Sequence, residues 1–141
     1  MKAFLDTSVM VAAFWADHAD HEASLKVLAA ANPANTSCSA HSLAELYATL
    51  TKLPVRPAIP PEQVILFIED LPRHLTLIRL DEADYLSAVR QLADRKQTGG
   101  LIYDALLLSC ARKSKAKAIY TYNLKYFREL APDLASIIRI P

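Results

Sequence analysis

The sequence predicts an α/β protein, a three-layer α/β/α domain built on a central, mainly parallel sheet. Two observations lead to this fold class. Short apolar segments with strand character alternate with segments of helical periodicity along the chain, which is typical of parallel strands joined by helices. The 141 residues, 52% of them hydrophobic and 22% charged, match one domain with a packed core, so we expect a single domain spanning residues 1–141.

The first strand is expected at residues 2–5, an apolar-leaning segment that stops at Asp6. Thr7 or Ser8 would cap the helix that follows, because a hydroxyl at this position can accept a bond from a free backbone amide. After a polar stretch, a second helix is expected over about 20–31.

A weak strand at residues 36–40 gains support from its position between two helices. The helix after it covers about 42–53, and its apolar face comes from residues at helical spacing, namely Leu43, Leu46, Tyr47 and Leu50. Four prolines between residues 54 and 61 end this helix, and another helix covers about 61–71.

Residues 75–80 are expected to form the third strand, and Asp81 to cap a long helix over about 82–97 that Gly99 and Gly100 end. The residues expected to face the core from this helix are Tyr85, Leu86, Val89 and Leu92. The remaining elements are a helix at about 102–115, a strand at 118–122, a short helix near 124–130 and a last strand at 137–140.

Composition excludes several classes of protein. The two glycines, Gly99 and Gly100, are adjacent, so the glycine-rich phosphate-binding fingerprints are absent. The two cysteines, Cys38 and Cys110, lie far apart without metal-binding spacing, and we expect both to be reduced and buried. The chain starts without a signal-peptide pattern and has no apolar run of membrane-spanning length, so we expect a cytoplasmic protein.

Polar residues stand where the predicted strands end or where helices begin, and they form the candidate site. Asp6 follows the first strand and Asn123 follows the strand at 118–122, while Glu45 and Asp104 lie near the starts of two apolar helices. Each residue alone is also explained as a helix cap or as a partner of the helix dipole. Asp104 is the strongest candidate, because an unpaired charge among apolar neighbours is costly.

Clustered carboxylates stay ionised together only when a cation is near. Oxygen ligands favour Mg²⁺, with Mn²⁺ as the alternative, and such ions also bind the phosphate of a substrate. The chemistry that follows from this donor set is phosphodiester hydrolysis by water that the metal activates.

Four segments resemble, in their order and spacing, the four successive motifs of PIN-domain ribonucleases: Leu5 to Val9, Leu43 to Leu46, Tyr103 to Leu106 and Tyr120 to Phe127. With its length, the chain resembles the small VapC-like toxins of bacterial type II toxin–antitoxin systems. The resemblance implies a PIN-like fold, a Mg²⁺-dependent endoribonuclease, structured RNA such as transfer RNA as substrate, a cognate antitoxin protein and a homodimer, without a membrane.

The resemblance also assigns residues. Asp6, Glu45 and Asp104 would be the catalytic acids that bind the metal. Asn123 stands where the family commonly has a fourth acid, so it would belong to the catalytic set but would weaken a second metal site. Thr121 would bond the acids or the substrate, and the expected substrate-binding residues are Thr7, Ser8, Thr121 and Lys125.

Two other functions stay open on the sequence. A phosphatase of the haloacid dehalogenase type also places an acid after a strand, but it needs a second Asp where this chain has Ser8. A catalytically weak PIN-like module that binds RNA or protein would explain Asn123.

Aromatic and charged residues bear on an RNA partner. Trp15, Tyr122 and Tyr126 are candidates for stacking on unpaired bases, with packing or a protein interface as the alternative. The net charge is +1, but residues 1–70 carry −4 and residues 71–141 carry +5. This asymmetry indicates either an acidic site facing a basic rim or scattered surface charge.

The histidines give no metal site. His18 and His21 do not complete a zinc ligand set, and we expect them in a solvated turn between helices. His41 and His74 have no assigned role.

Overall fold

A five-stranded parallel sheet forms the centre of the computed structural model, which describes all of residues 1–141. The strands are β1 (Ala3–Leu5), β2 (Thr36–Ser39), β3 (Thr76–Ile78), β4 (Ile119–Tyr120) and β5 (Ile138–Arg139). Their spatial order is β3-β2-β1-β4-β5, and every neighbouring pair is parallel. The predicted α/β class with a parallel sheet is therefore confirmed.

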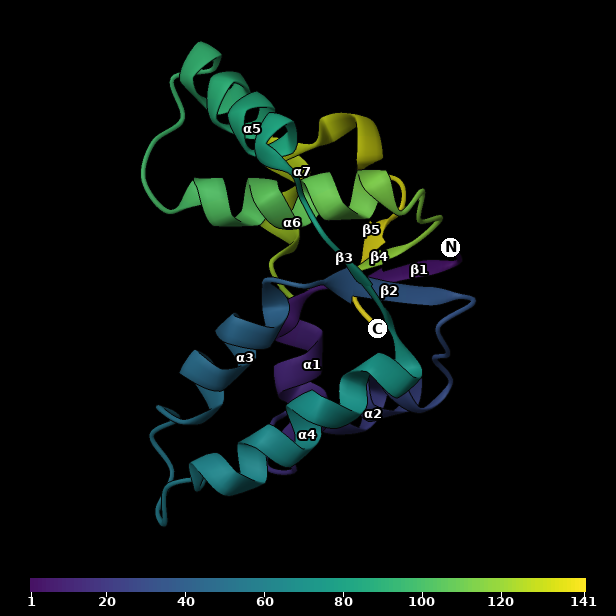
Figure 1. Ribbon diagram of the computed structural model, residues 1–141, viewed down its shortest axis with the longest axis vertical. Coiled ribbons are helices and arrows are strands. Elements are labelled where there is room, and N and C mark those ends of the chain that lie inside the picture. The colour runs from purple at the N-terminus through teal and green to yellow at the C-terminus, as the bar shows by residue number, and fades with distance from the viewer.

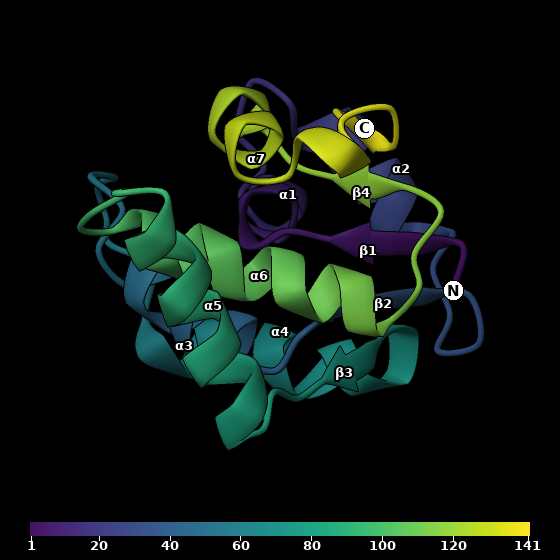
Figure 2. The same cartoon turned by 90° about the horizontal axis from the view of Figure 1, so that it is seen from above.

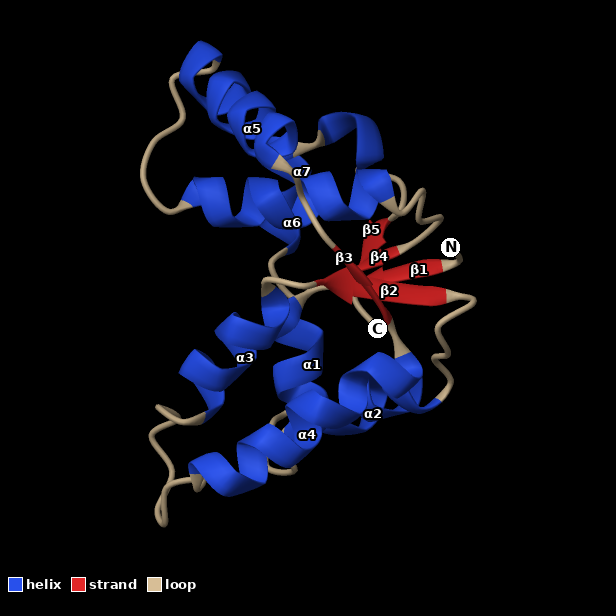
Figure 3. Cartoon of the chain, in the orientation of Figure 1, coloured by secondary structure: helices blue, strands red, loops and turns tan.

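Helices cover both faces of the sheet, so the molecule has three layers (Figures 1 and 3). One face carries α1 (Thr7–Phe14), α2 (His21–Ala29), α3 (Ser42–Leu50) and α4 (Pro61–His74). The other carries α5 (Glu82–Asp94), α6 (Leu101–Lys113) and α7 (Leu124–Leu130), and a 3₁₀ turn at Pro132–Leu134 precedes β5. Figure 2 shows α6 against the sheet and α5 outside it, in agreement with the contacts of α6 with β2 and of α5 with α6.

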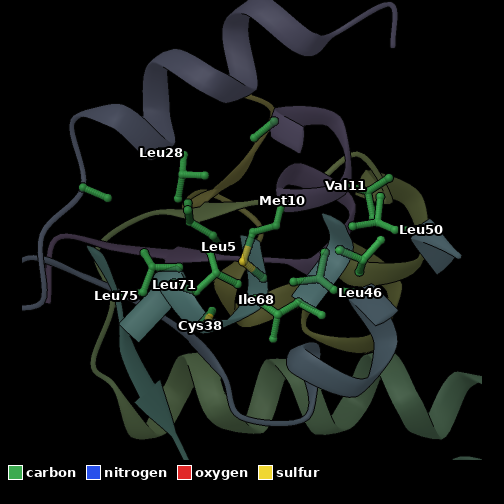
Figure 4. Packing of buried hydrophobic residues seen from close by; sticks show 13 residues of the cluster. Leu5, Met10, Val11, Leu28, Cys38, Leu46, Leu50, Ile68, Leu71 and Leu75 are labelled. Carbon is green, nitrogen blue, oxygen red and sulfur yellow. The ribbon is translucent and has the colours of Figure 1, made fainter. Parts of the chain in front are cut away.

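The short central strand β1 joins two hydrophobic clusters, because successive side chains of a strand point to opposite faces of the sheet. Leu5 packs with residues of α1, α2, α3 and α4, such as Met10 and Leu46 (Figure 4). Phe4 packs with residues of α6, α7 and β4, such as Phe127 and Ile119. Both clusters therefore fix the position at which β1 ends.

The start of α1 differs from the prediction by one residue. Asp6 occupies the N-cap position, and Thr7 and Ser8 are the first helical residues rather than the cap. The Asp6 side chain makes no cap bond, and its Oδ2 accepts instead from the hydroxyls of Ser8 and Thr121.

The end of α4 is also later than predicted. The helix runs to His74 and includes Pro72, although proline removes a helical hydrogen bond. Leu71 and Leu75 on either side of Pro72 are both buried, so packing holds the last turn against this loss.

The prediction for the face of α5 is mostly wrong. Of the four residues expected to face the core, only Leu92 is buried, while Tyr85, Leu86 and Val89 are 44%, 61% and 52% exposed. The reason is that α5 lies outside α6 and contacts the core along the stripe of Ala88 and Leu92. Its other large apolar residues therefore face mainly solvent.

Other local predictions are confirmed. Asp81 caps α5 in a reciprocal capping box with Asp84, each side chain accepting a 2.9 Å bond from the other residue's backbone amide. Cys38 and Cys110 are buried and form no disulfide. None of the helices combines the length and the apolar character that a membrane span requires.

Candidate functional site

A pocket of about 310 Å³ opens where β1, β2 and β4 end and their following segments begin. It contains six of the eight predicted site residues. The lining residues are Asp6, Thr7, Ser8, Val11, His18, Glu45, Thr49, Asp104, Leu107, Tyr122 and Asn123. The parallel sheet thus brings together residues that are up to 117 positions apart, as expected for a site at the carboxyl ends of strands.

Asp6 is the most buried member of the pocket, with 1% of its surface exposed. Its position directly after β1 fixes its backbone, and two hydroxyls donate to Oδ2: Ser8 at 2.6 Å and Thr121 at 2.8 Å. Burial raises the pKa of Asp6 above its ordinary value, and these hydroxyls oppose the rise only in part. The side chain is therefore held in one orientation but is poorly stabilised as an anion.

Glu45 reaches the pocket from the first turns of α3. The hydroxyl of Thr7 lies 3.3 Å from its Oε1 and 2.9 Å from the hydroxyl of Ser42, so Thr7 links α1 to α3 across the site. Burial raises the pKa of Glu45, and so do the charges of Asp6 and Asp104, while His41 opposes the rise. Three acids are thus close enough to repel one another.

Asp104 enters from the first turn of α6, on the other side of the pocket. It is half-buried, and no protein group donates a hydrogen bond to its carboxylate. Burial, followed by the charge of Asp6, raises the pKa of Asp104 to about 6. An acid so placed without a partner favours a proton or a cation.

Asn123 completes the pocket from the loop after β4. It occupies the N-cap position of α7, yet its side chain makes no cap bond. Its backbone amide donates to the hydroxyl of Thr121 at 2.9 Å, and Thr121 in turn donates to Asp6. The amide side chain of Asn123 is exposed and adds no charge to the pocket.

The other two predicted substrate-binding residues lie outside the pocket lining. Thr121 is completely buried, and of the two partners expected for its hydroxyl, the acids or the substrate, the structure shows the bond to Asp6. Lys125 is exposed on α7, with its Nζ 5.9 Å from the centre of the Tyr126 ring.

The donor set of the pocket fits a hydrated divalent cation. No three Asp, Glu, His or Cys side chains lie close enough together to hold a metal ion directly. Mg²⁺ retains several waters and needs only one or two protein carboxylates, so three spaced acids around an open polar pocket suit it. A cation there would relieve the repulsion that raises the pKa of Glu45 and Asp104.

The sequence did not predict that His18 lines the pocket. It lies in the turn between α1 and α2 as expected, but its ring lines the pocket and lies 6.1 Å from the Tyr122 ring. Trp15 packs edge-on against His18 at 5.7 Å, and the Tyr122 hydroxyl lies 2.7 Å from that of Ser24. These three rings form an aromatic wall, which we call the Trp15–His18–Tyr122 wall.

Comparisons with known proteins agree with this geometry. The family model of the PIN domain matches residues 3–131. Ribonuclease VapC40 of Mycobacterium tuberculosis is 34% identical over 114 residues, which are 81% of each chain.

Two solved structures are similar in fold. The first is VapC20 of Mycobacterium tuberculosis, described as a sarcin–ricin loop cleaving toxin, with a TM-score of 0.71 and 19% identity over 89% of this chain and 92% of that one. The second is a chain of VapBC2 from Rickettsia felis bound to a DNA fragment from their promoter, with a TM-score of 0.68 and 24% identity over 100% and 99%.

Proposed function

The chain is a VapC-like member of the PIN domain family, and we propose that it is a Mg²⁺-dependent endoribonuclease, the toxin of a type II toxin–antitoxin pair. One observation carries the proposal. Asp6, Glu45 and Asp104 come from three separate elements and converge on one open pocket, where burial raises the pKa of each. Acids in this state are suited to bind a cation rather than to stabilise the fold.

Mg²⁺, or Mn²⁺ in its place, would be held by Asp6, Glu45 and Asp104, by one or two of them directly and by the rest through its waters. When bound, the ion supplies a better water nucleophile and neutralises charge on phosphate oxygens. The residues of the chain orient this site. Ser8 and Thr121 both donate to Oδ2 of the Asp6 carboxylate, and Thr7 donates to Oε1 of Glu45. Asn123 offers an amide that can accept or donate a bond to the RNA without adding a negative charge near its phosphate.

The surroundings of the acids support an RNA substrate. The Trp15–His18–Tyr122 wall presents aromatic rings at the pocket, and rings of this kind stack on unpaired bases. Lys125, close to Asn123 in the chain, supplies a positive charge for a phosphate beyond the pocket. Loops of structured RNA, such as those of transfer RNA, offer both unpaired bases and phosphates.

Two protein partners belong to the proposal: a cognate antitoxin and a second copy of the chain. Exposed apolar residues support such partners. Leu86 and Val89 of α5 are 61% and 52% exposed, and Leu66 of α4 is 69% exposed. Light scattering of the purified chain, with Leu86→Glu for comparison, tests the homodimer: the variant is expected to be monomeric.

Cleavage of total RNA by purified, antitoxin-free protein tests the enzyme. The reaction is run with Mg²⁺, with Mn²⁺ and with EDTA, beside Asp104→Asn and the control Asp94→Asn, which changes an exposed acid of α5 outside the pocket. We expect discrete fragments that require metal, persist in the control and are lost in Asp104→Asn. Fragments that persist in EDTA or in Asp104→Asn would refute the metal-dependent mechanism.

Asn123 favours one alternative, a catalytically weak PIN-like module that binds RNA or protein. Under this alternative the folded wild type cleaves no RNA with either metal, and Asn123→Asp, which adds the missing charge, restores cleavage. Under the ribonuclease proposal the wild type cleaves without this change.

A further inference from the structure

A second aromatic feature lies beside two of the acids of the pocket, Glu45 and Asp104. The rings of His41 and Tyr103 are parallel, with an angle of 5° between their planes and 6.4 Å between their centres. The two residues come from different segments, since His41 precedes α3 and Tyr103 lies in the first turn of α6. Both side chains are exposed, and 56% of the Tyr103 surface is open to solvent.

This ring pair is fixed next to the acids by short backbone links. Tyr103 directly precedes Asp104. The backbone amide of Glu45 donates to the carbonyl of His41 at 3.2 Å, so His41 lies one helical turn before Glu45. The ring pair is therefore tied through the backbone to two of the three acids.

The His41 ring makes no hydrogen bond within the chain, and its one electrostatic interaction is with the Glu45 carboxylate beside the pocket. His41 occupies the N-cap position of α3, but its side chain makes no cap bond. Neither ring belongs to a hydrophobic cluster of the core. A solvent-exposed parallel ring pair with no structural partner is suited to stacking on a base.

A second pocket, of about 240 Å³, adjoins the ring pair where β2 and β3 end. Its lining includes Ala40, His41, Ile78, Arg79, Tyr85 and Leu106. Arg79 is exposed there and forms no ion pair, so its guanidinium is available for a phosphate. The pocket therefore combines an apolar floor, aromatic rings and an unpaired cation.

We propose that the His41–Tyr103 ring pair and the adjoining pocket form a nucleotide-binding subsite for the RNA. An unpaired base stacks on the rings, and its phosphate contacts Arg79. This proposal rests on the proposed ribonuclease function and adds to it the residues that position one nucleotide next to the cleaved bond. The subsite is separate from the Trp15–His18–Tyr122 wall and adds a second set of rings for bases near the acids.

Binding is measured in EDTA, where metal-dependent cleavage does not interfere. The probe is a fluorescein-labelled RNA hexamer of adenylate, together with six hexamers that each lack the base at one position. Loss of a stacked base costs about fivefold or more in affinity. We expect Tyr103→Leu and His41→Leu each to weaken binding of the intact hexamer by about this factor, and Tyr103→Phe, which keeps the ring, to bind as the wild type does.

The decisive comparison combines variant and probe. One abasic position is expected to weaken binding to the wild type by about fivefold and to have no further effect on Tyr103→Leu, because the same contact is lost only once. Tyr47→Leu is the matched control, since Tyr47 is a 45% exposed tyrosine of α3 that lines neither pocket. The proposal would be overturned if each abasic hexamer lost as much affinity, relative to the intact hexamer, with Tyr103→Leu as it does with the wild type.

Arg79 is tested by salt dependence. Removing one phosphate contact lowers the slope of log affinity against log salt by about 0.7 for a single strand. Arg79→Gln is expected to show this change, and Arg90→Gln, an exposed arginine of α5 outside both pockets, is expected to show none. An unchanged slope in Arg79→Gln would overturn the phosphate contact.

Parallel cleavage of total RNA by the wild type separates this proposal from the ribonuclease proposal. Cleavage with no coupling between Tyr103 and an abasic position overturns the subsite and leaves the ribonuclease. Coupled binding without cleavage supports the subsite and overturns the ribonuclease. A folded wild type that does not bind the hexamer at low salt overturns the subsite whatever the cleavage result.

Discussion

Asp104 carries a charge that opposes folding, so replacing it with Asn is expected to make the metal-free protein more stable. Burial, followed by the charge of Asp6, raises the pKa of Asp104 from 3.8 to about 6. The folded protein therefore holds a proton on Asp104 more tightly than the unfolded chain does. At neutral pH the wild type must ionise this group in an unfavourable place, whereas Asn has the same shape and no charge.

The magnitude follows from the pKa of Asp104. A rise from 3.8 to about 6 corresponds to about 3 kcal/mol of free energy of unfolding for a fully buried group. Because Asp104 is only half-buried, screening by water reduces this to about 1–2 kcal/mol. The folded state binds the extra proton between the two pKa values, so this contribution to stability is fully present below pH 3.8 and is lost as pH rises through about 6.

Urea unfolding in EDTA, at about pH 7.5 and about pH 4, measures the effect. Asp104→Asn is expected to exceed the wild type by about 1–2 kcal/mol at the higher pH and to match it at the lower. Asp94→Asn is the control, with no change at either pH. The reasoning is refuted if Asp104→Asn gives no gain at pH 7.5, or if it gives the same gain at pH 4.

Three further substitutions test the structure by urea unfolding. Thr121→Val removes the buried hydroxyl that donates to Asp6 at 2.8 Å, and it is expected to lower the free energy of unfolding by about 1–3 kcal/mol. Leu46→Ala leaves a cavity at a fully buried position and is expected to lower the free energy of unfolding by about 2–5 kcal/mol. A decrease below about 1 kcal/mol would contradict the packing. Asp81→Ala removes the N-cap of α5 and is expected to cost about 1 kcal/mol, with Glu82→Ala as the comparison.

Part of the pocket lining could be predicted from the sequence because some of its signals are local, whereas the expected roles of the residues came from the resemblance to PIN-domain ribonucleases. An apolar strand that ends in an acid, as at Asp6, or an acid within an apolar helix, as at Asp104, is visible without coordinates. The contacts between these segments could not be predicted in the same way. The contact between Thr7 and Glu45 depends on β1 lying beside β2, and no pattern within either segment gives that neighbour.

Two features could not be predicted because they depend on what packs outside an element. The apolar spacing in α5 predicts a face, but whether that face meets the core or solvent is decided by α6, which lies between α5 and the sheet. No role of His41 could be predicted from the sequence, because its partner Tyr103 is 62 positions away and lies next to it only in the folded chain.

The strand order has a consequence for synthesis of the protein on the ribosome. One edge of β1 is paired by β2 early, but its other edge waits for β4, which begins at Ile119 of 141 residues. Until then Asp6 lacks the Thr121 hydroxyl, and the pocket lacks Tyr122 and Asn123. A nascent chain therefore has no assembled pocket until more than four-fifths of it has been made, and a product truncated before β4 never completes the pocket.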